Sequence, residues 1–200
     1  MGTYAESSFH EDTSVGRTPN KSVRLAMVAI FSALIAVGTG VLSIPLPAPL
    51  FQITLAPAIY LAYAALGDKW DAFAATGIGG FIGEFYSIST SGGGSPIYPF
   101  GMVWARAPEA LMVAYAVGRG RKALVASMVL ATLYETFAFL IPDYFFYKYA
   151  LFGYSISSGY TALGLALTDL GTLVDLAFIP VALVLIAAAE PTFRRLGYRN

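Results

Sequence analysis

An arginine and a glutamate, Arg106 and Glu109, stand three residues apart inside an apolar run over residues 100–118. Residues with this spacing share one face of a helix. A charge at mid-membrane costs at least about 2.5–3.5 kcal/mol, so such residues usually face the interior of a helix bundle. Pro108 has no amide proton and leaves the carbonyl of Trp104 without its helical donor. We therefore predict a kinked helix that forms one wall of a polar pocket inside a membrane bundle.

The composition indicates the class of protein that holds this helix. Of 200 residues, 57% are hydrophobic and 12% are charged, whereas soluble domains carry about 25% charged residues. The mean hydropathy is +0.67, and the apolar runs are continuous rather than alternating. The chain has no cysteine, which excludes disulfides, thiolate metal sites and a cysteine nucleophile. We predict an all-α polytopic membrane protein.

The apolar runs divide the chain into two parts. Residues 1–21 are polar and without periodicity, which predicts a disordered cytoplasmic tail. Residues 22–195 are expected to form a six-helix transmembrane substrate-binding domain. Its helices are predicted over residues 23–42, 51–66, 70–87, 100–117, 122–141 and 167–189.

Basic residues mark one side of this bundle. Ten of the twelve lie before the first helix, in the 2–3 and 4–5 turns, or at the C-terminus. Lys148 lies on the opposite side, and Arg106 lies within the membrane. The positive-inside rule then predicts that both termini are cytoplasmic.

The three connections on the outer side are longer than the inner turns. Residues 43–49 are rich in proline and predict a polyproline segment. Residues 89–99 contain three consecutive glycines. Residues 142–161 are rich in aromatic side chains, which could form either a lid over a binding site or an interfacial belt.

Ionisable residues fall in the outer half of the predicted helices. Thr168, Thr172 and Asp175 form a polar face on the last helix at spacings of four and seven, with Asp175 near mid-depth. A pocket that opens only to the outside requires this asymmetry, whereas a channel requires polar groups through the full depth. Alternatively, Arg106 pairs with Glu109 or Glu135 only to hold helices together. The acids and the one arginine in the outer half are Glu84, Arg106, Glu109, Glu135 and Asp169.

The carboxylates outnumber the single arginine, so the pocket is net negative unless some acids are protonated. It would favour a cationic or amine-bearing ligand, with Trp104 and Tyr134 among the aromatics available for stacking or cation–π contact. On this basis Glu109→Gln or Glu135→Gln should weaken ligand binding without loss of folded protein. The candidate substrate-binding residues are Glu84, Trp104, Arg106, Glu109, Tyr134, Glu135 and Asp169.

Small residues form stripes on two helices. The first helix carries Ala26, Ala29, Ala33, Ala36 and Gly40, a surface that suits either internal packing or the docking of another membrane protein. The third helix carries Gly79 and Gly83, which predict close packing against a neighbour within the bundle.

Several function classes lack their motifs. There is no P-loop, and the sole histidine, His10, lies in the tail, so a Ser–His protease or a His-ligated zinc site is not expected. We expect no enzymatic activity, no cofactor, no metal site and no nucleic-acid binding. The basic inner turns follow from membrane topology and would also suit an anionic lipid surface.

The order of features resembles a known family. The small-residue motif of Ala29 and Ala33, the segment 52–57 that opens the second helix, the proline-rich outer loop and the glycine-rich third helix look like the substrate-binding S components of energy-coupling factor (ECF) transporters. The likeness covers residues 22–195. The combination of Glu84, Arg106 and Glu109 resembles the thiamine-precursor branch.

The resemblance implies a function and partners. It implies the substrate-binding subunit of an ECF-type ABC importer in a prokaryotic cell membrane, which captures a small vitamin-like nutrient from outside. Thiamine or a precursor is the leading candidate. A transmembrane coupling protein would dock around Ala29 and Ala33, and two cytoplasmic ATPase subunits would drive the cycle. The alternatives are a stand-alone proton-coupled secondary transporter that uses Glu109 and Glu135 as proton carriers, and a structural membrane protein without a ligand.

Overall fold

The computed structural model describes residues 19–45, 52–91, 97–151, 156 and 160–198. Most of the predicted tail and the central glycines of residues 89–99 lie outside these residues. The elements follow in the order α1 (Lys21–Gly40), β1 (Ser43–Pro45), β2 (Gln52–Thr54), α2 (Ala56–Leu66), α3 (Lys69–Ser91), α4 (Tyr98–Gly101), the π-helical turn η1 (Met102–Arg106), α5 (Ala107–Ala116), α6 (Arg121–Lys148), α7 (Ala162–Ala166), the 3₁₀ helix η3 (Leu167–Phe178) and α8 (Ile179–Arg195).

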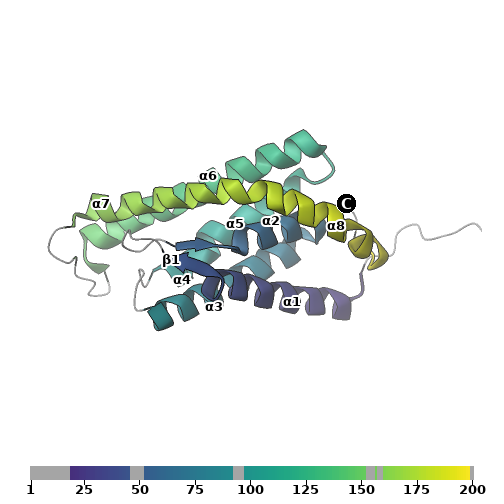
Figure 1. The fold of residues 1–200 in the computed structure, drawn as a ribbon, viewed down its shortest axis with the longest axis horizontal. Coiled ribbons are helices and arrows are strands. Elements are labelled where there is room, and N and C mark those ends of the chain that lie inside the picture. The colour runs from purple at the N-terminus through teal and green to yellow at the C-terminus, as the bar shows by residue number, and fades with distance from the viewer. Residues whose placement is uncertain (1–18, 46–51, 92–96, 152–155, 157–159, 199–200) are drawn as a thin grey trace, which may run out of the picture.

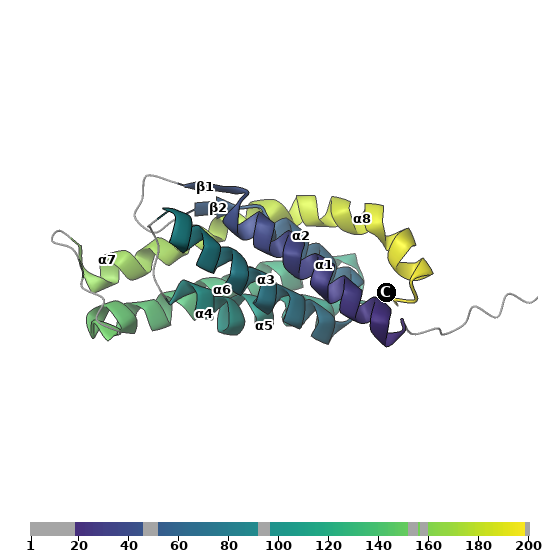
Figure 2. The same cartoon turned by 90° about the horizontal axis from the view of Figure 1, so that it is seen from below.

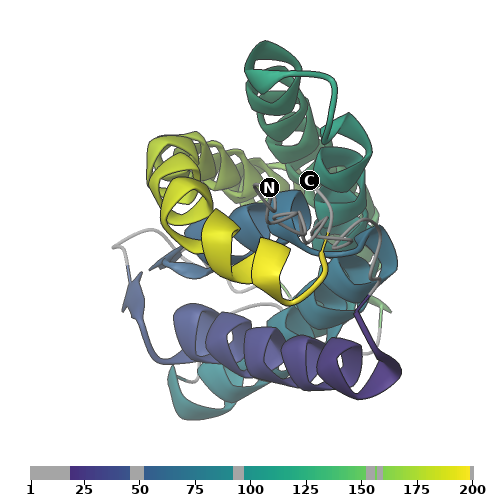
Figure 3. The same cartoon turned by 90° about the vertical axis from the view of Figure 1, so that its right-hand side faces the viewer.

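The helices form an elongated bundle. The start of α1 and the end of α8 lie at one end, and β1, α4 and α7 lie toward the other (Figures 1 and 2). The end-on view of Figure 3 shows α2 among the longer helices. Ten of the eleven α2 residues are buried, and Tyr60 and Tyr63 are its largest fully buried side chains. Pro57 starts α2 in the first turn, where its missing amide proton costs no helical hydrogen bond.

Three stretches are long and apolar enough to cross a membrane: α1, α6 and the continuous run Ala162–Arg195. Together with the composition they indicate a multi-pass membrane protein. Described helices occupy each of the six predicted stretches, although α2 spans only about 16 Å at 1.5 Å per residue and is too short to cross alone. The count of six spans and the cytoplasmic location of both termini remain predictions.

A short hairpin replaces part of the predicted polyproline segment. Ser43 pairs with Thr54 and Pro45 with Gln52 in an antiparallel ladder. The amide of Leu55 donates to the carbonyl of Gly38 in α1, 3.2 Å away, which holds the hairpin on the end of that helix. The polyproline prediction is therefore wrong for residues 43–45, because their main chain pairs with β2 instead of remaining solvated. The predicted helix over residues 51–66 begins only at Ala56 for the same reason.

Helix α6 extends further than the sequence predicts. We expected it to end at Ile141, but it continues through Pro142 to Lys148. Phe146 and Tyr147 anchor this extension by packing with Leu165 of α7. The first part of the aromatic 142–161 segment is therefore helical rather than a loop, and the lid and the interfacial belt both stay predictions.

Two glycines set the contact between α3 and α1. A Cβ on Gly79 would lie 2.5 Å from the carbonyl oxygen of Ser32, and a Cβ on Gly83 would lie 2.6 Å from that of Ala36. Both distances are shorter than van der Waals contact, so only glycine allows the two backbones to approach this closely. The predicted packing role of Gly79 and Gly83 is confirmed.

The last helical run changes its winding where its polar residues lie. Residues 167–178 form a 3₁₀ helix between α7 and α8. In a 3₁₀ helix, side chains three residues apart lie one above another. Asp169, Thr172 and Asp175 therefore share one edge, which adds Asp169 to the predicted polar face that holds Thr172 and Asp175.

Candidate functional site

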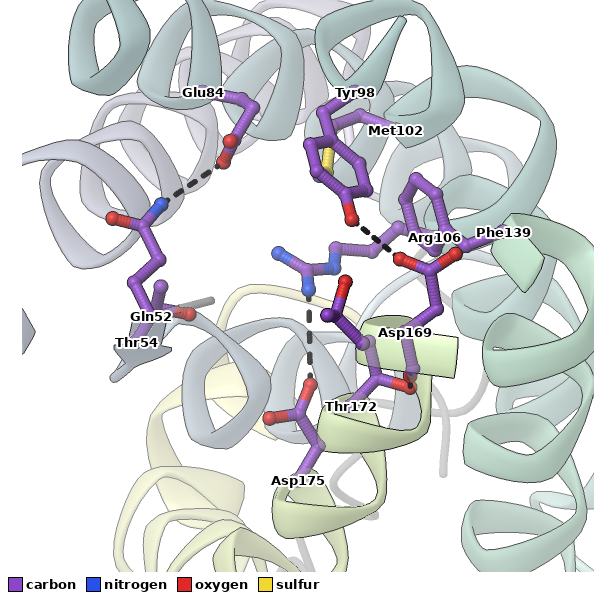
Figure 4. A pocket seen from close by; sticks show the side chains of 11 residues that line it. Gln52, Thr54, Glu84, Tyr98, Met102, Arg106, Phe139, Asp169, Thr172 and Asp175 are labelled. Atoms are coloured by element: carbon purple, nitrogen blue, oxygen red, sulfur yellow. Dashed lines mark hydrogen bonds and ion pairs between the residues drawn. The ribbon is translucent and has the colours of Figure 1, made fainter. Parts of the chain in front are cut away.

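A polar pocket lies between the hairpin, α3, η1, α6 and η3. Its cavity volume is about 60 Å³, enough for a few water molecules. Figure 4 shows the guanidinium of Arg106 pointing into it. The lining residues are Gln52, Thr54, Glu84, Tyr98, Met102, Arg106, Phe139, Thr168, Asp169, Thr172 and Asp175.

The hairpin and α3 build one side of the pocket. The side-chain amide of Gln52 donates to Glu84 at 3.3 Å, and its carbonyl accepts from the hydroxyl of Ser87 at 2.9 Å. These bonds fix the orientation of the amide, so that Gln52 and Glu84 present an amide and a carboxylate next to each other (Figure 4). Glu84 is only 7% exposed, although its carboxylate borders the cavity.

Arg106 occupies the centre. Its Nε donates to Glu135 Oε1 at 2.7 Å, and its Nη2 lies 3.7 Å from Asp175 Oδ2. The guanidinium carbon also lies 5.5 Å from the ring centroid of Tyr60. Arg106 is 6% exposed, so its charge is held by these partners rather than by water.

The 3₁₀ edge builds the opposite side. The hydroxyl of Tyr98 donates to Asp169 Oδ1 (Figure 4). The hydroxyl groups of Thr136 and Thr172 share a hydrogen bond of 2.7 Å that joins α6 to η3. Asp169 and Asp175 are 2% and 4% exposed, so the pocket presents two buried carboxylates along this edge.

A second polar layer lies behind Arg106. Tyr60 donates to Glu109 Oε2 at 2.7 Å and lies 3.4 Å from Glu135 Oε2, and Thr132 donates to Glu109 Oε1 at 3.0 Å. Both glutamates are fully buried and neither lines the cavity. They support Arg106 from behind instead of facing a ligand.

The structure therefore brings together only part of the predicted site. Glu84, Arg106 and Asp169 line the pocket, whereas Glu109 and Glu135 form the layer beneath it. Our alternative of an Arg106–Glu135 pair also describes the structure, and it coexists with a cavity on the other side of the guanidinium.

Trp104 and Tyr134 lie away from the cavity. They are 37% and 38% exposed and form hydrogen bonds between η1 and α6, with the hydroxyl of Tyr134 donating to the carbonyl of Trp104. We therefore remove both from the candidate binding residues. As amphipathic side chains on the outside of the bundle they have a structural role there instead.

Sequence reasoning left several lining residues out of the candidate site. Gln52 and Thr54 come from a strand that we expected to be helix, and Met102 and Phe139 carry no polar signal. Thr168, Thr172 and Asp175 were recognised as a polar face but not assigned to the site. Tyr98 lies within the predicted 89–99 connection and was not assigned to the site, whereas its hydroxyl donates to Asp169.

The lining groups of the pocket are suited to binding a small molecule. The lining offers one guanidinium, three carboxylates, an amide and several hydroxyls beside two apolar side chains. Within the described residues there is no group of three or more metal-ligating side chains. Such a site can hold a small polar molecule through charge and hydrogen bonds.

The small-residue stripe of α1 divides between two environments. Ala36 and Gly40 lie against Gly83 of α3. Ala29 and Ala33 are exposed on the face of α1 that is turned away from the other helices. Large apolar side chains flank them on the same face, including Leu25 and Ile30, which are 72% and 53% exposed.

Comparisons with known proteins identify the fold. No protein-family model matches the chain, and no curated protein matches it. The chain is similar to a solved structure described as "Structure and mechanism of the S component of a bacterial ECF transporter", with a TM-score of 0.62 and 18% sequence identity over 88% of this chain and 99% of that chain. The resemblance inferred from the sequence is confirmed at the level of the fold.

Proposed function

We propose that this chain, which has the fold of the S component of a bacterial ECF transporter, is the substrate-binding subunit of an ECF-type importer. Its substrate is a small vitamin-like nutrient with a cationic or amine group. The observation that carries this proposal is the buried pocket around Arg106, where the three carboxyl groups of Glu84, Asp169 and Asp175 surround a single guanidinium.

Thiamine or a precursor remains the leading substrate candidate. A heteroaromatic ring could lie against the apolar side chains of Met102 and Phe139 while its amine reaches a carboxylate. A cavity of about 60 Å³ is smaller than typical ligand pockets of about 300–1,000 Å³, so binding requires the surrounding side chains to move apart.

The partners follow from the same proposal. A transmembrane coupling protein docks on the exposed face of α1 around Ala29 and Ala33, where small residues allow close approach of a second helix. Two cytoplasmic ATPase subunits supply the energy, and the complex lies in a prokaryotic cell membrane.

Mass spectrometry of small molecules retained by the purified protein tests this function. We expect one amine-bearing or cationic heteroaromatic compound, released on denaturation and depleted after Glu84→Gln. If the purified protein retains no compound, titration with thiamine and with its pyrimidine precursor tests whether it binds either one. Failure of both would favour a structural membrane protein without a ligand.

A further inference from the structure

Two buried carboxylates lie where α6 packs against η3, and one of them borders the pocket. Asp143 is on α6 and Asp169 is on η3. Asp143 is 1% exposed and Asp169 is 2% exposed. Asp143 belongs to the extension of α6 that the sequence did not predict, and the proposed function assigns it no role.

Much of the hydrogen-bonding capacity of these carboxylates is unused. Both oxygens of Asp143 and Oδ2 of Asp169 lack a hydrogen-bond donor of acceptable geometry within the described part of the chain. The hydroxyl of Tyr98 engages only Asp169 Oδ1, and Tyr147 is the polar neighbour of Asp143 one turn along α6. Burying a carboxylate without a donor costs free energy, so a bound positive group would stabilise both carboxylates.

The basic side chains nearest in the fold have other partners. Arg106 is held by Glu135 and Asp175. Lys148 lies at the exposed end of α6, with its ammonium 5.3 Å and 5.5 Å from the ring centroids of Tyr144 and Tyr149. Among the described residues, no salt bridge reaches Asp143 or Asp169, so a cation bound from outside could pair with both.

We propose that Asp143 and Asp169 form a binding site for a compact cation, supplied either as an alkali metal ion or as the primary ammonium group of the transported molecule. Either charge accepts several oxygen ligands, which the free carboxylate oxygens provide. Asp169 borders the cavity, so the site is reached from the pocket. The ammonium form rests on the proposed function and orients the substrate, with its amine toward α6 and its remainder toward Gln52 and Glu84.

Thermal unfolding of the full chain in detergent tests this site with defined probes. At constant ionic strength, choline chloride is replaced stepwise by sodium chloride or by methylammonium chloride. We expect Tm to rise by about 3–5 °C when the concentration of a cation that binds the site reaches roughly ten times its Kd. A rise with sodium assigns an alkali ion, and a rise only with methylammonium assigns an amine.

Matched variants locate the effect. Asp143→Asn and Asp169→Asn should each abolish the rise, and Asp68→Asn, which alters a carboxylate paired with Arg24 at the other end of the bundle, should retain it. If an asparagine variant does not fold, Asp169→Glu should weaken the response by displacing the charge. No cation-specific rise in the unmodified chain, or a rise that persists in these variants, would overturn the site. A retained nutrient without any salt response would reject this site and leave the proposed function intact.

Discussion

Tyr134 donates a hydrogen bond of 2.8 Å to the main-chain carbonyl of Trp104, the acceptor that Pro108 leaves without a helical donor. The relationship is reciprocal. Pro142 frees the carbonyl of Ala138 in α6, and the indole of Trp104 donates to that oxygen at 3.1 Å. Each helix therefore supplies the side-chain donor that the proline of the other helix requires. This exchange joins a π-helical turn in one helix to an internal proline in the other.

The exchange predicts a coupling between Tyr134 and Pro108. Tyr134→Phe should lower the free energy of unfolding by about 0.5–1.5 kcal/mol, since the Trp104 carbonyl loses its donor. In a Pro108→Ala background the same substitution should cost less, because the amide of residue 108 can donate instead. Unfolding of the four proteins in detergent gives the coupling energy. Equal costs in both backgrounds would contradict the exchange.

The Arg106–Glu135 pair predicts that Glu135→Gln acts on stability first. From the sequence we expected weaker ligand binding without loss of folded protein. Since Glu135 lies behind the guanidinium and is fully buried, its neutralisation leaves a buried charge poorly paired, and we now expect a cost of about 3–5 kcal/mol. Thermal unfolding measures it, with Glu190→Gln near the C-terminus as the control. An unchanged Tm would show that Arg106 has sufficient partners elsewhere.

For Glu84 we expect the opposite result, a loss of ligand binding without a loss of stability. Its carboxylate borders the cavity and contacts only the amide of Gln52 among its resolved hydrogen bonds. Glu84→Gln should therefore leave the fold intact and weaken binding of a cationic ligand about 10–100-fold, the range for a hydrogen bond to a charged group. Isothermal titration with the retained compound measures this change. Affinity equal to that of Glu190→Gln would remove Glu84 from the site.

Two alanine substitutions in α3 should differ sharply. Gly83→Ala places a methyl group 2.6 Å from the Ala36 carbonyl and should destabilise the protein by about 1–3 kcal/mol through overpacking. Gly77→Ala meets only the Ala107 side chain at 3.4 Å and should be neutral or slightly stabilising, because alanine favours helix. Parallel thermal unfolding compares them. Similar losses from both substitutions would mean that helix α3 is not held by this close contact.

The exposed stripe of α1 predicts a defect in assembly alone. Ala33→Trp places a large side chain on the proposed docking face, so the complex with the coupling protein should be lost while the isolated chain still binds ligand. Co-purification with the coupling protein and ATPases measures assembly. Ala187→Trp on the exposed face of α8 is the matched control. Normal assembly of Ala33→Trp would place the docking surface elsewhere.

The sequence predicted an all-α membrane protein with charged residues inside the bundle. Long apolar runs make membrane helices easy to recognise, and a charged residue within such a run is conspicuous. Glu84, Arg106 and Asp169 could be assigned to a pocket from depth alone. Depth could not separate Glu135, which points behind Arg106, from residues that border the cavity, since both lie at similar levels.

The remaining differences have local causes. The strand at Gln52 depends on pairing with residues across a loop, which no local pattern encodes. The 3₁₀ winding that aligns Asp169 with Asp175 changes the residue spacing itself, so an α-helical template left Asp169 off the polar face of Thr168, Thr172 and Asp175 that borders the pocket. Pro142 leaves the carbonyl of Ala138 without a helical donor, so the sequence predicted that the helix ends at Ile141. The helix continues because the indole of Trp104, in a distant segment, donates to that carbonyl.

The hairpin joins the two proposed binding surfaces mechanically. Strand β1 follows α1 almost directly and pairs with β2, and the amide of Leu55 is bonded to the end of α1. A tilt of α1 against α3 therefore displaces the strand that carries Gln52 and Thr54. If the coupling protein tilts α1, linkage requires that occupancy of the pocket changes affinity for that partner by the same factor as the partner changes affinity for the nutrient.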